Sequence, residues 1–342
     1  MSAVLNKRNI IILLVLVAIG FPLITTNTYL IHVMTLAFIW MIGVYGLNLL
    51  AGYTGYLSLA HAGFFAIGAY GLGILTVKAH MSFWLAFVLS LVITCLIGLL
   101  VGLIALRTSE HFFAIYTMCL GYIIYLVIDK WESLTEGVRG LIGIPAPQGF
   151  GPITFETEKS HYYLVLFFLL LVILLMYRII HSLTGRSYIA IRNSEDLALT
   201  IGIATGRNKL AVFVLSTFFA GLSGALYASF VRFIGPDIGN IAIIFDLLTY
   251  LVVGGIGTLT GPLIGTMLVM WLSQLLQDFQ QYRMLIFGPL LTILVIFYPR
   301  GIVGGVTDVY RKRMAKKEKQ RAVRKDSYIQ SELRPENQVK EG

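Results

Sequence analysis

Long apolar runs separated by short polar breaks make up most of the chain. Each run is close to the roughly 20 residues that a helix needs to cross the hydrocarbon core of a membrane. The breaks collect most of the charged residues. We therefore expect an all-α, polytopic integral membrane protein with about ten transmembrane helices, some of them broken at glycine. The predicted spans lie near residues 9–24, 29–50, 56–77, 82–106, 112–129, 161–181, 208–231, 243–257, 260–277 and 284–299.

Composition supports this fold class and excludes a soluble protein and a disordered chain. Of the 342 residues, 57% are hydrophobic and only 13% are charged, whereas a soluble domain has roughly 25% charged residues. Disordered chains are poor in apolar residues and rich in charge, so a disordered chain is excluded as well. Both cysteines, Cys95 and Cys119, lie inside apolar runs, which gives no support for a disulfide framework.

Lys and Arg residues are more frequent in the polar breaks on one side of the predicted spans than in those on the other side. This asymmetry predicts the orientation of the chain in the membrane. With ten spans and both termini in the cytoplasm, 20 of the 26 Lys and Arg residues fall on the cytoplasmic side, where membrane proteins collect them. The first apolar run follows Lys7 and Arg8 as in a signal peptide, but no small-residue cleavage site comes after it. We expect an uncleaved first span and a multi-pass protein of the cytoplasmic membrane.

The spans and loops suggest one transmembrane domain, residues 1–306, followed by a basic tail, residues 307–342. The tail has nine Lys and Arg residues between Tyr310 and Lys325, so we expect it to be disordered or to lie on anionic lipid headgroups. No basic face with interleaved aromatic residues occurs in the spans, and nucleic-acid binding is therefore not expected.

Two loops are long enough to bind partners. The outer loop, about residues 130–160, contains ordered Gly-Pro turns and is a candidate docking site for an extracytoplasmic partner. The inner loop, about residues 182–209, mixes charged and apolar positions. It is either one or two short amphipathic helices on the cytoplasmic face or a plain solvated connector. Its candidate functional residues are Arg186, Ala190, Arg192, Glu195, Asp196 and Gly202.

Polar side chains inside the predicted spans are candidates for the translocation path, because burying them in lipid is costly. One group surrounds the break between the second and third spans, and another lies in the eighth span. Either group can contact substrate or can form structural hydrogen bonds between helices; for His61 the structural alternative has the greater weight. The candidates are Asn48, Tyr53, Ser58, His61, Asp246 and Thr249.

Glycines near the eighth and ninth spans form a third set of candidates. Small residues at four-residue spacing let helices approach closely in lipid. Glycine-broken helices can also expose backbone groups to a transported substrate. Both interpretations stay open for Gly254, Gly255, Gly257, Gly261 and Gly265.

No set of residues suggests covalent chemistry. The histidines are dispersed without metal-ligand spacing, so no metal site is expected. The glycines from Gly255 to Gly261 lie outside any βαβ pattern, and no Walker A motif occurs in the chain. An enzyme is therefore not expected, no cofactor is expected, and any ATP-driven motor would have to be a separate subunit.

Four stretches, in order, resemble one known family. They are LNLLAGYTGYLSLAHAGFFAIGAY (47–70), TEGVRGLIGIP (135–145), GRSYIAIRNSEDLALTIG (185–202), and VGGIGTLTGP (253–262) with PRG (299–301). The chain is similar to the permease subunits of branched-chain amino acid ABC importers, and specifically to the M-type partner of the H/M permease pair. It departs from the family pattern at Glu136, where a glycine is usual, and at Ile189, where an acidic residue is usual.

The resemblance implies a function and a set of partners. It implies that the inner loop docks on a cytoplasmic ATPase subunit, which uses the ATP. It further implies that a substrate-binding protein delivers the ligand from outside, and that a second permease subunit completes a heterodimeric pathway. The expected function is import of leucine, isoleucine and valine. A related urea or amide importer and an ion-coupled secondary carrier remain alternatives.

Overall fold

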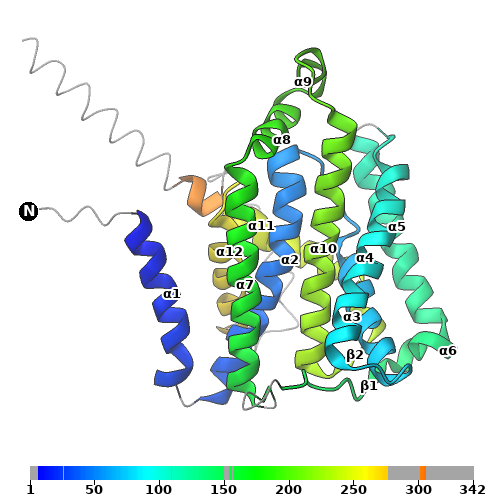
Figure 1. Ribbon diagram of the computed structural model, residues 1–342, viewed down its shortest axis with the longest axis vertical. Helices are drawn as coiled ribbons and strands as arrows, with labels where there is room; N and C mark the ends of the chain where they lie inside the picture. Colours follow the sequence, from blue (N-terminus) through cyan, green and yellow to red (C-terminus); the bar gives the residue numbers. More distant parts are fainter. Residues whose placement is uncertain are drawn as a thin grey trace, which may run out of the picture.

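The computed structural model describes residues 7–25, 27–108, 110–149, 154–155, 157–275 and 301–305. Helices dominate this part of the chain, so the all-α fold class is confirmed (Figure 1). In chain order the elements are α1 (Lys7–Ile24), α2 (Thr28–Leu47), the π-helical turn η1 (Asn48–Gly52), α3 (His61–Val77), α4 (Phe83–Ala105), α5 (Glu110–Lys130), α6 (Glu132–Thr135), η2 (Gly137–Arg139), β1 (Leu141–Ile142), α7 (Glu158–Ile180), α8 (Leu183–Asn193), α9 (Glu195–Thr200), α10 (Thr205–Val231), β2 (Phe233–Ile234), η3 (Pro236–Gly239), α11 (Ile241–Gly254) and α12 (Gly261–Leu275).

Five helices in the described ranges are long and apolar enough to cross a membrane. They are Thr28–Gly52, Phe83–Ala105, Phe112–Lys130, Glu158–Ile180 and Thr205–Val231. Three apolar helices, α3, α11 and α12, are shorter. The count of ten spans stays a prediction, because the tenth predicted span, 284–299, and the predicted tail, 307–342, lie outside the described residues.

Glycines set where two of the predicted spans begin and end. The third span was expected from residue 56, but α3 starts at His61, after a non-helical stretch that contains Gly55 at φ +82°. The eighth was expected to reach residue 257, but α11 ends at Gly254, because Gly255 has φ +121°. A positive φ interrupts a right-handed helix and is open mainly to glycine.

Burial distinguishes inner helices from outer ones. The apolar segments of α2 and α10 are 78% and 67% buried, whereas those of α4, α5 and α7 are 33%, 22% and 33% buried. The outer helices expose many large side chains, such as Leu100, Phe112 and Phe167. An apolar surface of this extent is not compatible with water and is the surface that faces lipid.

Small residues allow the inner helices to pack closely. At the crossing of α3 and α10, a Cβ added to Gly68 would overlap the backbone of Gly221, and one added to Gly224 would overlap the carbonyl of Phe65. In lipid, helix association relies on close packing rather than on the hydrophobic effect, so backbone approach of this kind stabilises the bundle.

The two ends of the bundle differ in architecture. At one end, at the top of Figure 1, α8 and α9 project beyond the long helices. At the other end lie α6, η2 and a short antiparallel ribbon in which Leu141 of β1 faces Ile234 of β2. No sequence pattern predicted this ribbon, because each strand has only two residues.

Candidate functional site

The predicted inner loop folds into two helices rather than a plain connector. Ser182 caps α8, because its Oγ accepts a hydrogen bond from the Gly185 amide at 3.2 Å. Ser194 caps α9 in the same way, accepting from the Leu197 amide at 3.3 Å. Side-chain caps of this type satisfy amides that the first turn of a helix leaves unpaired. The element α8–α9 therefore has a defined shape at the end of the bundle.

The element α8–α9 has one face turned inward and one exposed. Tyr188 and Ile191 are buried against the bundle. Leu183, Leu197 and Ile201 are 78%, 64% and 67% exposed. Of the predicted coupling residues, Ala190 and Glu195 are half-buried, and Arg186, Arg192, Asp196 and Gly202 are exposed. Exposed large apolar side chains mixed with charges are typical of a surface that binds another protein.

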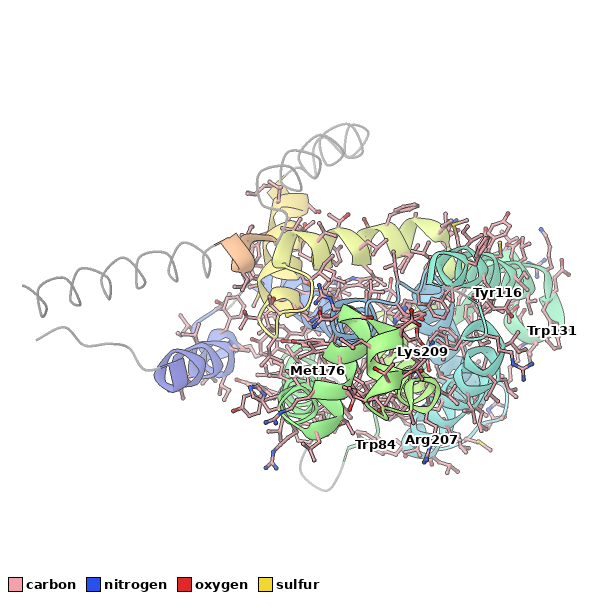
Figure 2. All side chains as sticks on the ribbon, turned by 90° about the horizontal axis from the view of Figure 1, so that it is seen from above. Trp84, Tyr116, Trp131, Met176, Arg207 and Lys209 are labelled. Atoms are coloured by element: carbon pink, nitrogen blue, oxygen red, sulfur yellow. The ribbon has the colours of Figure 1, made fainter. Side chains whose placement is uncertain are left out.

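An ion pair connects α9 to the start of α10. Lys209 Nζ lies 2.5 Å from Glu195 Oε1 and donates to the Tyr56 hydroxyl at 3.1 Å. The Tyr56 hydroxyl in turn donates to Glu195 Oε2 at 2.5 Å. Figure 2 looks down on this end, where buried Lys209 lies within the bundle and Arg207 at its margin.

The contacts among Lys209, Tyr56 and Glu195 also shift the pKa of the Glu195 carboxyl group. Partial burial favours the neutral form of Glu195, but the hydrogen bonds from Lys209 and Tyr56 outweigh it, and the pKa of Glu195 lies below its usual value. Glu195 is therefore ionised at neutral pH. Of these residues, Glu195 was predicted from the sequence, whereas Lys209 was counted only as a loop charge. The available signal was a lysine at the start of a predicted span, where a cation requires a partner.

A second set of contacts brings α8, the π-helical turn and the α11–α12 turn together. Arg192 Nη1 donates to the Gly52 carbonyl at 2.5 Å. Asn48 Nδ2 donates to the Thr258 carbonyl at 2.8 Å, and the Gly257 amide donates to Asn48 Oδ1 at 2.8 Å. We call Asn48, Gly52, Arg192, Gly257 and Thr258 the junction. Three of these residues were predicted separately, as path, coupling and glycine candidates.

The other path candidates lie in different surroundings. His61 Nε2 is 2.6 Å from Ser216 Oγ on α10, and both residues are fully buried. Ser58 Oγ accepts from the Ala60 amide at 3.3 Å, and Tyr53 is also buried. His61 thus makes the structural type of contact, between two helices.

Two path candidates lie on α11. The Thr249 hydroxyl donates to the Phe245 carbonyl, 2.8 Å away and one turn earlier in the same helix. Asp246 is half-buried. Two apolar grooves of about 330 and 680 Å³ lie along α4 and α10, and no predicted path residue lines either of them.

The glycine candidates fall into a packing group and a helix-break group, and exposure of backbone groups to a substrate stays a prediction. Gly254, Gly261 and Gly265 allow close packing of α11 on α12, because a Cβ at Gly254 would overlap the Gly261 carbonyl. Gly255 and Gly257 break the helix, with φ of +121° and +75°. Both the close contact and the interruption are therefore present.

No metal centre is apparent in the part of the chain that the structure describes. There, no three His, Cys, Asp or Glu side chains gather in a way that could hold a metal ion. The polar clusters described above can bind a ligand, orient side chains or transmit movement between helices.

Comparison with known proteins identifies the family. A family model described as "Branched-chain amino acid transport system / permease component" matches residues 29–297. The branched-chain amino acid permease protein LivM of Escherichia coli K12 is 29% identical over 324 residues, covering 88% of this chain and 76% of the relative. LivM of Salmonella typhimurium LT2 is 27% identical over the same length.

A second permease protein, LivH, is also related, over a shorter stretch. LivH of Escherichia coli K12 is 30% identical over 129 residues, which is 37% of this chain and 41% of the relative. No solved structure matches the chain. The chain is thus a multi-pass membrane protein and a transport component rather than an enzyme, and it belongs to the family of permease components of branched-chain amino acid transport systems, as one of the M type.

Proposed function

We propose that the chain is one permease subunit of an ATP-driven importer that moves leucine, isoleucine and valine across the cytoplasmic membrane. The family match supports the substrate class. The observation that carries the ATP-driven mode is the projecting element α8–α9, with Leu183, Leu197 and Ile201 exposed. On this proposal the element docks on a cytoplasmic ATPase subunit. ATP is bound and hydrolysed there, and this chain holds no cofactor.

The partners follow from the two ends and from the related chains. Similarity to both LivM and LivH supports a permease pair, and we propose that a second permease subunit completes the pathway. The outer end exposes Trp131, Val138, Ile142 and Phe233 beside the ribbon. This apolar surface is our proposed docking site for an extracytoplasmic substrate-binding protein. Both termini are then cytoplasmic.

The translocation path needs polar groups that replace the water around the ammonium and carboxylate groups of an amino acid. An amino acid loses its water shell in the membrane, and polar side chains or broken-helix backbone groups replace part of it. We retain Tyr53, Ser58, His61, Asp246 and Thr249 as proposed path residues. We reassign Asn48 from the path to the junction, because its amide oxygen and nitrogen are both bonded to the α11–α12 turn.

Reconstitution tests the proposal. The complex of both permeases, the ATPase and the binding protein is placed in liposomes, and leucine uptake and ATP hydrolysis are measured with leucine or urea. Leucine-stimulated hydrolysis with uptake supports the proposal. Stimulation by urea alone would overturn the substrate. Uptake by the chain without an ATPase, driven by an ion gradient, would overturn the ATP-driven mode.

A matched pair of variants tests the docking surface. Leu197→Glu places a charge on the exposed face of α9 and should abolish copurification of the ATPase. Val138→Glu makes the same change at the other end, where the side chain is 75% exposed, and should leave ATPase copurification unchanged. Retention of the ATPase by Leu197→Glu would contradict the assignment.

A further inference from the structure

The junction joins three elements at one point. Arg192 lies in the last turn of α8, two residues before the Ser194 cap of α9. Gly52 ends the π-helical turn that prolongs α2, and Gly257 and Thr258 form the turn between α11 and α12. The π-helical turn is 140 residues from Arg192 and as many as 210 from the α11–α12 turn in sequence, so the fold brings these segments together.

Arg192 caps the most buried long helix of the bundle. The last carbonyls of a helix have no partner within the helix, and the helix dipole makes that end negative. The Gly52 carbonyl is one of these groups, and it accepts from the Arg192 guanidinium at 2.5 Å. A cationic donor at this place satisfies the carbonyl and the dipole together. Arg192 therefore binds α8 to the end of α2.

The α11–α12 turn is closely packed against the same atoms. A Cβ added to Gly257 would lie 2.6 Å from Arg192 Nη1 and 2.8 Å from the Gly52 carbonyl oxygen. Gly257 also has φ +75°, so glycine is required here by conformation as well as by space. Close-packed groups transmit displacement. Movement of Arg192 consequently displaces either Gly52 or the turn.

Asn48, the first residue of the π-helical turn, binds the α11–α12 turn, whereas Arg192 contacts Gly52, the last residue of the π-helical turn. The Asn48 amide is fully buried, donates to Thr258 and accepts from Gly257. Turns of π-helix inside a longer helix are frequent at functional sites. Here the π-helical turn carries both contacts, Asn48 to the turn and Gly52 to α8.

We propose that Arg192 is a positioning residue for transport: through the junction it makes the α11–α12 turn follow the movement of α8. The proposal rests on the proposed function, in which an ATPase subunit moves α8–α9. Beyond that function, we infer that Arg192 passes the movement on and that the α11–α12 turn receives it.

The experiment compares Arg192→Gln, Arg192→Lys and Arg178→Gln in the full reconstituted complex. The measured quantity is leucine taken up per ATP hydrolysed. Arg192→Gln should lower this ratio about tenfold, the scale of one lost charge-assisted hydrogen bond. Arg192→Lys should keep more than half of it, because one ammonium donor serves one carbonyl. Arg178→Gln, at an exposed arginine in the last turn of α7, should leave the ratio unchanged.

Hydrogen exchange on the purified chain provides a readout that does not depend on transport. Arg192→Gln should accelerate amide exchange at residues 255–260 by several-fold, whereas Arg178→Gln should not. Combining Arg192→Gln with Asn48→Ala should lower the coupling ratio no further than Arg192→Gln alone, because both act in one junction.

The failure of this proposal is distinguishable from failure of the proposed function. If the wild-type complex hydrolyses ATP and imports leucine but Arg192→Gln keeps both the coupling ratio and slow exchange at 255–260, the positioning role is wrong. Additive losses in the double variant would also overturn it. If the wild-type complex does not import leucine, the proposed function fails, and the exchange measurement still tests the junction.

Discussion

Each end of the bundle has a lysine–glutamate ion pair, and the two pairs differ in burial. At the α8–α9 end, the side chains of Lys209 and Glu195 are 9% and 30% exposed. At the ribbon end, Lys78 Nζ lies 2.6 Å from Glu136 Oε1, and the side chains are 29% and 43% exposed. Each lysine also has a second acceptor, the Tyr56 hydroxyl or the Ser133 carbonyl. Both pairs join a lysine ammonium to a glutamate carboxylate. Water screens the more exposed Lys78–Glu136 pair more strongly, so we expect that pair to contribute less to stability.

The two ends are also held in shape by different means. The ribbon end has, besides the side-chain contacts of Lys78, several backbone features: the β1–β2 pairing, and residues with positive φ at Glu136, Gly140 and Arg232. The α8–α9 end depends on side chains that reach distant segments, as Tyr56 does to Glu195 and Arg192 to Gly52. A shape maintained by a few side-chain contacts can rearrange as a unit. One maintained by backbone pairing is suited to present a constant surface.

The largest expected effect is loss of the inner ion pair. Glu195→Ala leaves the buried Lys209 ammonium with only the Tyr56 hydroxyl, and we expect about 3 kcal/mol of destabilisation, the low end for breaking a buried pair, because Glu195 is partly exposed. Thermal unfolding in detergent measures it. Asp196→Ala, on the exposed neighbour, is the control and should change the midpoint little. Equal effects of both variants would contradict the contrast between burial and exposure.

A smaller effect is expected from the backbone of the ribbon end. Gly140→Ala forces a non-glycine residue to φ +71° and places its Cβ 2.5 Å from the Ile234 carbonyl oxygen, so we expect a loss of about 2 kcal/mol. Gly143→Ala is the matched control, with φ +82° and open space around the Cβ. It should cost only the backbone term, about 1 kcal/mol. The two unfolding midpoints should therefore differ, and identical midpoints would exclude the clash.

The pH dependence should distinguish the two carboxylates. The pKa of Glu195 lies below the ordinary 4.5, so its contribution to stability is complete above 4.5 and is lost as pH falls through the lowered pKa. The hydrogen bond and charge of Lys78 also lower the pKa of Glu136. The midpoint difference between wild type and Glu195→Gln should shrink as the solution is acidified below 4.5. The corresponding difference for Glu136→Gln should be smaller throughout, and a larger one would reverse the comparison.

The smallest effect is expected at the exposed pair itself. Lys78→Met should lower the unfolding midpoint much less than Glu195→Ala does, and added salt should reduce even that difference. Glu136→Gly also removes the pair, but it relieves the left-handed backbone at φ +62°, so its midpoint should not fall below that of Lys78→Met. A marked loss in Glu136→Gly at high salt would show that Glu136 stabilises this end in another way.

The sequence was sufficient for features that depend on local composition. The predicted span 82–106 corresponds to α4 at Phe83–Ala105, and 161–181 to α7 at Glu158–Ile180, because a lipid-facing helix must be continuously apolar. It was also sufficient to choose glycines at helix interruptions, such as Gly255. Both kinds of feature are determined within one segment.

Features that depend on distant pairing could not be predicted in this way. The strands β1 and β2 have two residues each, which is too short for any periodicity. Asn48, Arg192 and Gly257 were each selected, but for unrelated reasons, and their hydrogen bonds join residues at least 140 positions apart. Lys209 was missed because its partner Glu195 belongs to a separate helix.

The π-helical turn has a consequence for how insertions and deletions act on this protein. Each residue of an α-helix rotates the chain by about 100° around the axis. Removing one residue between Asn48 and Gly52 would rotate the rest of the helix by about that angle if the winding stayed the same, but a return from the wider π-helical turn to α-helical winding compensates most of this rotation. A one-residue gap in an alignment of relatives across this stretch is therefore expected to mark the loss of the π-helical turn, with the helix beyond it kept close to its register.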